Sequence, residues 1–509
     1  MKKHIIIVGA GYGSLALANL LARAGHTVEM FERNSMPGGR TGLVSQDGFR
    51  FDTGPSWYLM PEVFEQYYKI FDRDVAKELD LIRLTPGYKV FFEGTDPVII
   101  KGDLNEDVHT FEALEPGAGV KLEKYVAKSE KIYDLSVKHF LYTNFQKPTE
   151  LLHPDILKNS LSMLRYAFST IDNHVSRYFT DSRIKRLLEY HMVFLGSSPY
   201  QAPAIYSLMS VLDYKSGVFY PRKGMYSLID SIASLGQSLG VQYHYNTDVQ
   251  SIDSVGDRAT GITLSDGSQH KADIVVSGAD LHFTETSLLP NEKQSFPESY
   301  WERRQPGPSA LLISLGVRGS LPQLLHHNLL FVEDWQENFK AIYEDYTIPK
   351  SASIYVCNPS KTDASVAPDG HENIFILVPL PAKKTYTASE QEALTARFIG
   401  QFADMIGQPD LASRIVTRYI FGPEDFRTVY HSWQAGALGG QSHLLSQSAI
   451  FRTQNKSKKL DNLYYVGAGT TPGIGLPMCL MSAQLVYKRI AGTKSGGPVT
   501  HIEPLEDVQ

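Results

Sequence analysis

The hydrophobic pattern at the start of the chain predicts a strand, a tight turn and a helix. Residues 5–8 are four apolar, mostly β-branched residues in a row, which is typical of a buried strand. Glycines follow directly, and residues 15–25 then carry small and apolar residues at helical spacing. A second apolar run, residues 27–32, ends in an acid. This order of elements is typical of the first half of a dinucleotide-binding fold.

The residues of the turn and of the second strand suit a dinucleotide. Gly9 allows the sharp turn, and Gly11 lets a pyrophosphate approach the backbone, so that free N–H groups of the helix face its charge. Glu32 lies about twenty residues further on, where a carboxylate holds the ribose hydroxyls. It would repel a 2′-phosphate, which argues against NADP. We expect cofactor contacts from Gly9, Gly11, Gly13, Ser14 and Glu32.

A secretory signal peptide is the alternative interpretation of the N-terminus. Met1 is followed by two lysines and an apolar run, and Ala16, Leu17 and Ala18 imitate a cleavage site. Glycines within the apolar run and the acid at the end of the second strand argue against it.

A second glycine-rich segment, formed by Gly38, Gly39 and Arg40, distinguishes between cofactors. It comes soon after Glu32, where a nicotinamide dehydrogenase usually continues into another helix. Two glycines here predict backbone that passes close to the cofactor again, with Arg40 near its phosphates or the flavin. The alternative is an ordinary turn with a solvated arginine. In this position the segment favours FAD.

The same kind of structure returns near the C-terminus. Residues 461–466 predict a strand, residues 467–477 a glycine-rich turn, and a helix is expected from Met478 to about Ile490. That helix would present a second N-terminus to the cofactor. Together with the N-terminal segment it predicts a discontinuous cofactor domain. Further cofactor contacts are expected from four residues: Val249, Gly467, Gly469 and Gly475.

The middle of the chain predicts two further regions. Residues 309–381 are rich in strands and suit the sheet of a substrate domain. Residues 120–195 are mostly helical and rich in aromatic and basic residues. This helical region could place apolar and basic side chains on a membrane surface, or it could be a plain lid with a solvated basic face. Periodicity alone does not separate the two.

Composition narrows the classes of function. The chain has 509 residues and a net charge of −6, so no nucleic-acid-binding surface is expected. Cys357 and Cys479 have neither CxxC nor metal-ligand spacing; we expect two packing residues in a reducing compartment and no metal site. No apolar run is long enough to span a bilayer. The polar residues 493–509 predict a disordered tail.

The chain resembles the bacterial-type phytoene desaturases, in the carotenoid-desaturase branch of the flavin amine-oxidase superfamily. The resemblance covers nearly the whole length. The matching segments are residues 9–14, 32, 38–40, 51–55, 217–225, 359–363, 365–368 and 462–477.

Several positions depart from the family pattern. Ser14 and Lys223 stand where the family usually has glycine, and Thr471 stands where it usually has histidine. Ser14 predicts slightly looser contact between helix and strand. Thr471 lies in the turn expected beside the flavin. We therefore expect threonine in place of histidine to affect the reaction more than the binding of the cofactor. Three residues of this turn and the following helix are bulkier than usual: Ile474, Leu476 and Met478.

The resemblance implies FAD-dependent removal of two hydrogens from phytoene or a related polyene precursor. It implies an α/β fold, with a discontinuous Rossmann-like FAD-binding domain, an inserted mixed-sheet substrate domain and a helical cap. The expected bounds are 1–70, 217–292 and 450–492 for the FAD domain, 71–119 and 293–449 for the substrate domain, and 120–216 for the cap. Because so long a hydrocarbon is insoluble, we expect a cytoplasmic protein attached peripherally to the membrane by its cap. Oxygen or a quinone would accept the electrons.

This chemistry needs little catalytic machinery. An allylic hydride passes to flavin N5 and a proton leaves the neighbouring carbon, so the protein mainly aligns the substrate and excludes water. Candidate bases are Asp155, His191 and His431, although such residues more often have structural roles.

Two alternative functions stay open at this point. One is a carotenoid isomerase, ketolase or end-group oxidase of the same superfamily, which Thr471 keeps in consideration. The other is a non-catalytic prenyl-binding escort protein, against which the intact Glu32 and glycine-rich segments argue.

Overall fold

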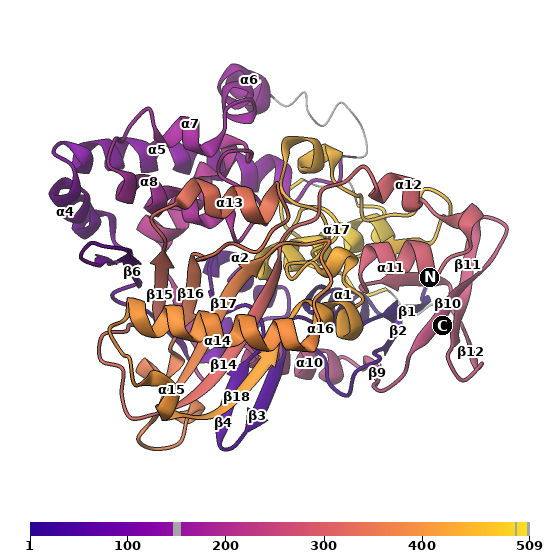
Figure 1. Cartoon of the computed structure of the whole chain (residues 1–509). Helices are drawn as coiled ribbons and strands as arrows, with labels where there is room; N and C mark the ends of the chain where they lie inside the picture. Colours follow the sequence, from indigo (N-terminus) through magenta and orange to yellow (C-terminus); the bar gives the residue numbers. More distant parts are fainter. Residues whose placement is uncertain (146–153, 494–495, 506–509) are drawn as a thin grey trace.

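A five-stranded parallel sheet unites three distant parts of the chain (Figure 1). The computed structural model, which describes residues 1–145, 154–493 and 496–505, gives it the strand order β19-β13-β1-β2-β9. The strands are β1 (His4–Val8), β2 (Thr27–Phe31), β9 (Gln242–His244), β13 (Ile274–Ser277) and β19 (Leu463–Tyr465). The strand predicted at the N-terminus therefore lies at the centre of the sheet.

Both faces of this sheet are covered, which explains the unbroken apolar run of β1. Ile5 and Ile7 pack towards helices, whereas Ile6 and Val8 pack towards the opposite face. The helices are α1 (Tyr12–Arg23), α2 (Pro61–Lys69), α10 (Ser227–Ser238) and α17 (Leu476–Ala491). The other face carries a three-stranded antiparallel sheet and two short helices: β10 (Val249–Val255), β11 (Arg258–Leu264), β12 (Gln269–Lys271), α11 (Leu281–Ser287) and α12 (Glu298–Trp301).

A seven-stranded mixed sheet forms the second half of the molecule, in the order β18-β14-β17-β16-β15-β6-β7. Neighbouring strands are antiparallel except β15 and β6, which are parallel. Its strands are β6 (Tyr88–Phe92), β7 (Val98–Ile100), β14 (Ser309–Arg318), β15 (His327–Phe331), β16 (Ile354–Cys357), β17 (His371–Leu380) and β18 (Ile415–Phe421). Helix α14 (Ala388–Met405) lies across one face (Figure 1).

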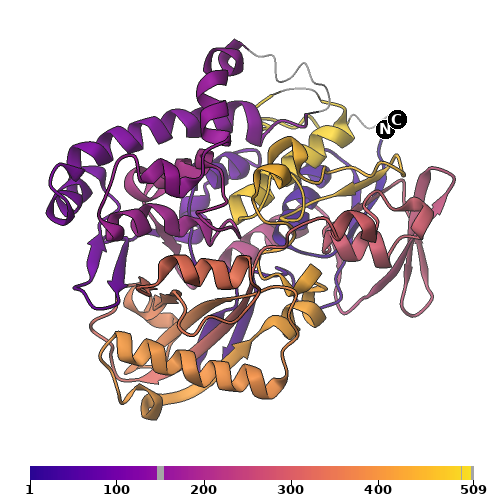
Figure 2. The same ribbon diagram turned by 45° about the horizontal axis from the view of Figure 1, so that its top comes forward.

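The opposite face of the mixed sheet carries the helical cap (Figure 2). Alternate residues of β14 divide between the two faces: Leu311 and Ile313 pack under α14, and Leu312 packs with the cap. The cap helices are α4 (Leu104–Leu114), α5 (Ala118–Ser136), α6 (Pro154–Ala167), α7 (Ile171–Val175) and α8 (Ser182–Glu189). Helix α5 continues into one π-helical segment, Val137–Leu141.

Short elements connect these layers. Two antiparallel pairs are β3 (Leu43–Gln46) with β4 (Phe49–Asp52), and β5 (Leu81–Arg83) with β8 (Phe219–Pro221). The remaining α-helices of the described chain are α3 (Val75–Leu79), α9 (Met209–Val211), α13 (Trp335–Tyr343), α15 (Leu411–Arg414) and α16 (Pro423–Tyr430). The predicted fold class, a discontinuous α/β cofactor domain with an inserted mixed sheet and a helical cap, is confirmed.

The disordered tail predicted for residues 493–509 is wrong for the part that the structure describes. Val499 and Ile502 are buried against the helices of the parallel sheet. The Val499 amide donates to Gln484 Oε1 over 2.7 Å, and the Leu505 amide donates to Ala24 O over 3.0 Å. These partners lie far away in the sequence, so the polar composition of the tail did not reveal them. Among the described residues, no helix is both long and apolar enough to cross a bilayer.

Candidate functional site

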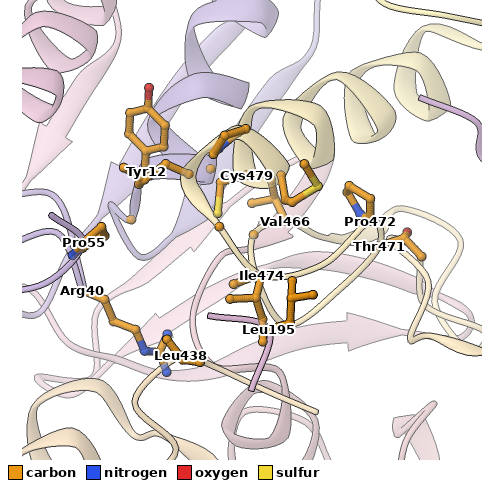
Figure 3. Close-up of a pocket in the computed structure, with 18 of the residues that line it drawn as sticks. Tyr12, Arg40, Pro55, Leu195, Leu438, Val466, Thr471, Pro472, Ile474 and Cys479 are labelled. Atoms are coloured by element: carbon orange, nitrogen blue, oxygen red, sulfur yellow. The ribbon is translucent and has the colours of Figure 1, made fainter. Parts of the chain in front are cut away.

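A cavity of about 870 Å³ extends from the carboxyl ends of the parallel strands to the helical cap. This end of an open parallel sheet is where ligands usually bind. The wall combines distant segments: the β1–α1 turn, the end of β2, residues 38–41 and 53–57, the turn before α17, and the inner side of the cap. Figure 3 shows part of this wall, with Arg40 and Pro55 on one side and Thr471 and Pro472 on the other.

Close backbone packing fixes the turn between β1 and α1. Gly9 has a φ of 84°, and a side-chain carbon there would lie 3.3 Å from the Ala279 nitrogen. A side-chain carbon on Gly13 would lie 3.1 Å from the Cα of Gly467, so glycine lets the two cofactor turns meet. No side chain caps the start of α1 at Tyr12, and its first N–H groups are left for an anionic ligand.

Ser14 keeps the contact between α1 and the sheet tight. A side-chain carbon on Gly278, at the end of β13, would lie only 1.8 Å from Ser14 Oγ. The serine hydroxyl therefore occupies the space that Gly278 leaves open. The looser contact predicted from Ser14 is wrong, because glycine stands on the opposite side of the contact.

The Glu32 carboxylate is held at the end of β2. Its Oε2 accepts from the Ala10 amide over 2.8 Å. Its Oε1 accepts from the backbone and side-chain nitrogens of Asn34 over 2.9 and 2.7 Å. Glu32 is buried yet lines the cavity, so a ribose diol could donate to a carboxylate that is already oriented.

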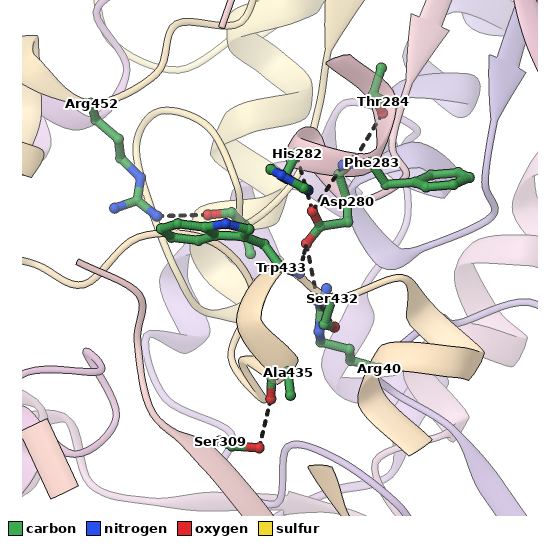
Figure 4. Close-up of polar contacts among 11 residues, drawn as sticks. Arg40, Asp280, His282, Phe283, Thr284, Ser309, Ser432, Trp433, Ala435 and Arg452 are labelled. Carbon is green, nitrogen blue, oxygen red and sulfur yellow. Dashed lines mark hydrogen bonds and ion pairs between the residues drawn. The ribbon is translucent and has the colours of Figure 1, made fainter. Parts of the chain in front are cut away.

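The segment Gly38–Arg40 lies against the first turn. Gly38 forms a bridge with Gly11, and a side-chain carbon on Gly39 would lie 3.4 Å from the Gly11 Cα. Arg40 donates to Ser432 Oγ over 2.6 Å and lies 3.7 Å from Asp280 Oδ2 (Figure 4). The paired guanidinium adds one positive charge at this end of the cavity, which suits a pyrophosphate.

Asp280 caps the start of helix α11. Its Oδ1 accepts from the amides of His282 and Phe283 at the start of α11 (Figure 4). The same carboxylate orients Arg40. It therefore positions a cation beside the cofactor end of the cavity.

A buried arginine supports the glycine-rich turn before α17. Arg452 donates to Thr470 O over 3.0 Å and to Ala468 O over 2.8 Å. Burial lowers its pKa to about 10, and no carboxylate of the described chain pairs with it. Asn455 Nδ2 donates to Thr471 O over 3.0 Å, and the Thr471 hydroxyl donates to Asn455 Oδ1. Thr471 thus has a defined place in this turn.

The structure brings nearly all predicted cofactor residues to one end of the cavity. Twelve residues were predicted to contact the cofactor, and the eleven of them that line the cavity are Gly9, Gly11, Gly13, Ser14, Glu32, Gly38, Gly39, Arg40, Val249, Gly467 and Gly475. Thr471 lines the cavity as well. Gly469 does not line the cavity. A side-chain carbon on Gly440 would lie 3.1 Å from the Gly469 Cα, on the other side of the turn. Gly469 therefore permits close backbone packing.

None of the three candidate bases lies in the part of the cavity under the cap. Asp155 accepts from Lys138 Nζ over 2.8 Å and lies outside the cavity wall. His191 is buried outside it, 2.8 Å from an oxygen of Asp213. His431 does line the cavity, but at the Glu32 end, where its ring stacks on Phe283 at 3.8 Å.

The cap end of the cavity is apolar. Residues of the π-helical segment, α6, 194–195, 203–212 and 445–451 form it, largely with aliphatic and aromatic side chains. Three of the residues that line this end are exposed to solvent, Leu164, Ile450 and Phe451, by 54%, 42% and 56%, and Phe168, directly after α6, is 77% exposed. We call these four residues the mouth patch.

His443 is a cavity residue that the sequence analysis did not select. It is 4% exposed and lies beside the turn before α17, because a side-chain carbon on Gly473 would be 2.6 Å from His443 Nε2. Its partner Leu195 is distant in the sequence. A single histidine in a loop offers no spacing signal that could have identified it.

A buried cluster behind the cavity wall was also missed. One potential metal-ligand atom from each of His326, His327 and Cys357 lies within 4.8 Å of the others. Burial raises the pKa of the Cys357 thiol to about 12. A buried, protonated thiol is compatible with the packing role predicted for Cys357.

Comparisons with known proteins agree with this geometry. The family model of flavin-containing amine oxidoreductases matches residues 15–490. Carotenoid 3,4-desaturase of Haloarcula japonica is 37% identical over 483 residues, which cover 95% of this chain and 97% of that protein. The zeta-carotene-forming phytoene desaturase of Myxococcus xanthus is 33% identical over 491 residues, covering 96% and 94%. A solved oxidoreductase from Methanosarcina mazei has a TM-score of 0.61 at 16% identity, covering 95% and 100%, which shows likeness of fold.

Proposed function

The chain belongs to the flavin-containing amine oxidoreductase family, as a carotenoid desaturase, and from that premise we propose that FAD and a long polyene bind end to end in its cavity. The supporting observation is the continuity of the cavity. One end has two glycine-rich turns, two helix N-termini and Glu32, and the other end is apolar and opens at the mouth patch.

The residues at the polar end fit FAD in particular. Glu32 suits the ribose of an adenosine, and the N-terminus of α1 with Arg40 suits a pyrophosphate. A mononucleotide would leave the Glu32 end without a ligand. The bound flavin would supply the acceptor for a hydride from the polyene.

The apolar end aligns the polyene and excludes water. A C40 chain that buries several hundred Å² of apolar surface gains roughly 25 cal/mol per Å², which is ample for binding without hydrogen bonds. The apolar end holds the polyene in one orientation relative to the flavin. The reaction between the two then becomes a unimolecular step that does not depend on a rare encounter. We propose phytoene or a related precursor as the substrate.

We further propose that the mouth patch contacts a lipid bilayer. Leu164 lies on α6 and Phe168 directly follows this helix, and Leu164 and Phe451 both line the cavity. Lys158 and Arg165 are exposed on the same helix. Apolar side chains beside cations suit an anionic bilayer surface. The substrate would pass from the bilayer into the cavity, and oxygen or a membrane quinone would accept the electrons.

Two features support the location and the domain division. Cys357 and Cys479 are both free thiols, which supports the cytoplasmic face of the membrane. We propose the domain bounds expected from the sequence with one change. Helix α4 (Leu104–Leu114) packs with α5 and is better counted with the cap.

Pigment analysis of cells that accumulate phytoene and express this chain tests the function. Coloured products with longer conjugation are expected, and their absorbance counts the desaturation steps. Unchanged phytoene despite a flavin-loaded protein would contradict phytoene as substrate; the same assay would then be repeated with cells that make later carotenoids or C30 precursors. A product with an added oxygen and no new C=C bond would contradict desaturation itself.

A further inference from the structure

The tautomer of His443 is fixed by a backbone carbonyl. Its Nδ1 lies 2.8 Å from Leu195 O. A carbonyl oxygen only accepts hydrogen bonds, so Nδ1 must carry the proton, and a neutral ring then has an unprotonated Nε2. No group of the described chain forms a hydrogen bond with that Nε2. His443 therefore holds a free lone pair in the cavity.

That lone pair lies beside the turn expected next to the flavin. A side-chain carbon on Gly473 would lie 2.6 Å from His443 Nε2 and 3.3 Å from Cε1, so this edge of the ring touches the Gly473 backbone. Gly473 belongs to the same turn as Thr471, directly before α17. Leu195 and Ile474 are shown on the cavity wall at this point (Figure 3). The geometry places Nε2 where the polar and apolar ends of the cavity join.

The surroundings of His443 favour its neutral form. The nearest charged group is Arg452, which is buried behind the turn, and Tyr206 packs edge-on at 5.6 Å between ring centroids. The Tyr206 hydroxyl is engaged with Ser448 Oγ at 2.8 Å. Burial and the Arg452 charge lower the pKa of His443 to about 3. The ring therefore stays unprotonated at neutral pH.

We propose that His443 Nε2 is the base that removes the proton during desaturation, an inference that rests on the proposed function. One polyene carbon loses a hydride to the oxidised flavin. The adjacent carbon loses a proton to Nε2, and the electron pair of that C–H bond becomes the new π bond. The polyene thus loses two hydrogens: one leaves as a hydride, which carries two electrons to the flavin, and the other leaves as a proton, which carries one positive charge to the imidazole.

A weak base is sufficient for this step. Once the hydride is leaving, the adjacent C–H bond lies next to a developing allylic cation and is strongly acidic. A weakly basic imidazole in a fixed position can accept such a proton and release it again afterwards. Of the other ionisable residues of the cavity, Arg40 binds Ser432 and Tyr206 binds Ser448. Burial raises the pKa of Tyr12 and of Cys479, so these two side chains stay protonated.

Anaerobic reduction of the flavin by the polyene, measured per bound flavin, tests the step. His443→Asn keeps a donor near the position of Nδ1 and lacks a basic atom. We expect reduction to slow by roughly a hundredfold or more, because general bases contribute about 10²–10⁴-fold. His174→Asn is the control: the same substitution at another buried histidine, in the cap and outside the cavity wall. Rates within about threefold of wild type in His443→Asn would overturn the proposal.

A second measurement does not depend on turnover. In the flavin-loaded protein with ¹⁵N-labelled histidine, the NMR signal that disappears in His443→Asn should show an unprotonated Nε2 and a protonated Nδ1 at pH 7. A protonated Nε2 would overturn the assignment of the base. A wild type that no polyene reduces would overturn the proposed function itself, whereas equal reduction in wild type and His443→Asn would overturn only the role of His443.

Discussion

The two ends of the cavity recognise their ligands by different means. At the cofactor end, recognition depends on a few groups in fixed positions: two glycine turns, the amides of α1 and the Glu32 carboxylate. At the cap end, apolar side chains from five separate segments share a large surface. Single substitutions should therefore have large effects at the cofactor end and graded effects at the cap end.

The largest effect should come from Glu32→Arg. The guanidinium puts a cation where the ribose diol donates and leaves the Ala10 amide without its acceptor, at a cost of about 1–3 kcal/mol for that group alone. We expect bound flavin to fall below about a tenth of wild type, a loss of at least about 1.4 kcal/mol. The flavin-to-protein absorbance ratio after gel filtration measures it.

Glu29→Arg is the matched control, since Glu29 lies on the same strand outside the cavity and pairs with His4 and His244. Its flavin content should stay near that of wild type. Full flavin retention in Glu32→Arg would mean that β2 does not hold the ribose.

An intermediate effect is expected at the mouth patch. Phe168→Glu combined with Phe451→Glu removes two exposed apolar side chains, each worth about 1.5–3 kcal/mol when buried in lipid. Binding to vesicles of phosphatidylcholine and phosphatidylglycerol should weaken at least about tenfold, with unchanged flavin content. Sedimentation of vesicles measures the bound fraction.

Val255→Glu is the control for this pair. Val255 is 74% exposed, but it lies at the end of β10, away from the cap (Figure 1). It should leave vesicle binding unchanged. Equal binding by the double variant and wild type would show that another surface meets the membrane.

The smallest effect should come from Thr471→His, at the junction of the two ends. The substitution removes the hydroxyl that binds Asn455 and places a third imidazole in the cavity wall, in addition to those of His431 and His443. We expect a shift of about two- to tenfold in the ratio of products, which corresponds to about 0.4–1.4 kcal/mol. Chromatography of the extracted pigments measures this ratio. Thr471→Val separates loss of the hydroxyl from gain of the ring; a product ratio identical to wild type in both variants would place Thr471 away from the polyene.

The same contrast explains what could be predicted from the sequence. Glycine turns at strand ends are required by local backbone geometry, so Gly9, Gly11 and Glu32 could be identified from spacing alone. Arg40 followed from its neighbours Gly38 and Gly39. Central strands such as β1 and β14 were predicted because each is a nearly continuous apolar run buried on two faces.

The rest depends on contacts between distant segments. Asp155 and His191 were selected by residue type, but other partners hold them outside the cavity. His443 acquires its tautomer from Leu195 and its place from Gly473, and neither is adjacent in the sequence. Ser14 was judged on α1 alone, whereas the matching glycine, Gly278, directly follows β13. No local sequence pattern can identify such contacts between distant residues.

The position of β19 in the sequence determines when, during synthesis of the chain, the cofactor site can be completed. The parallel sheet and the glycine turn that meets Gly13 are completed only by residues 463–475, more than 400 residues after β1. A nascent chain must therefore be extended through these residues before its cofactor can bind tightly. Cofactor capture can act as a check on completed synthesis, because a prematurely terminated chain lacks the strand that closes the site.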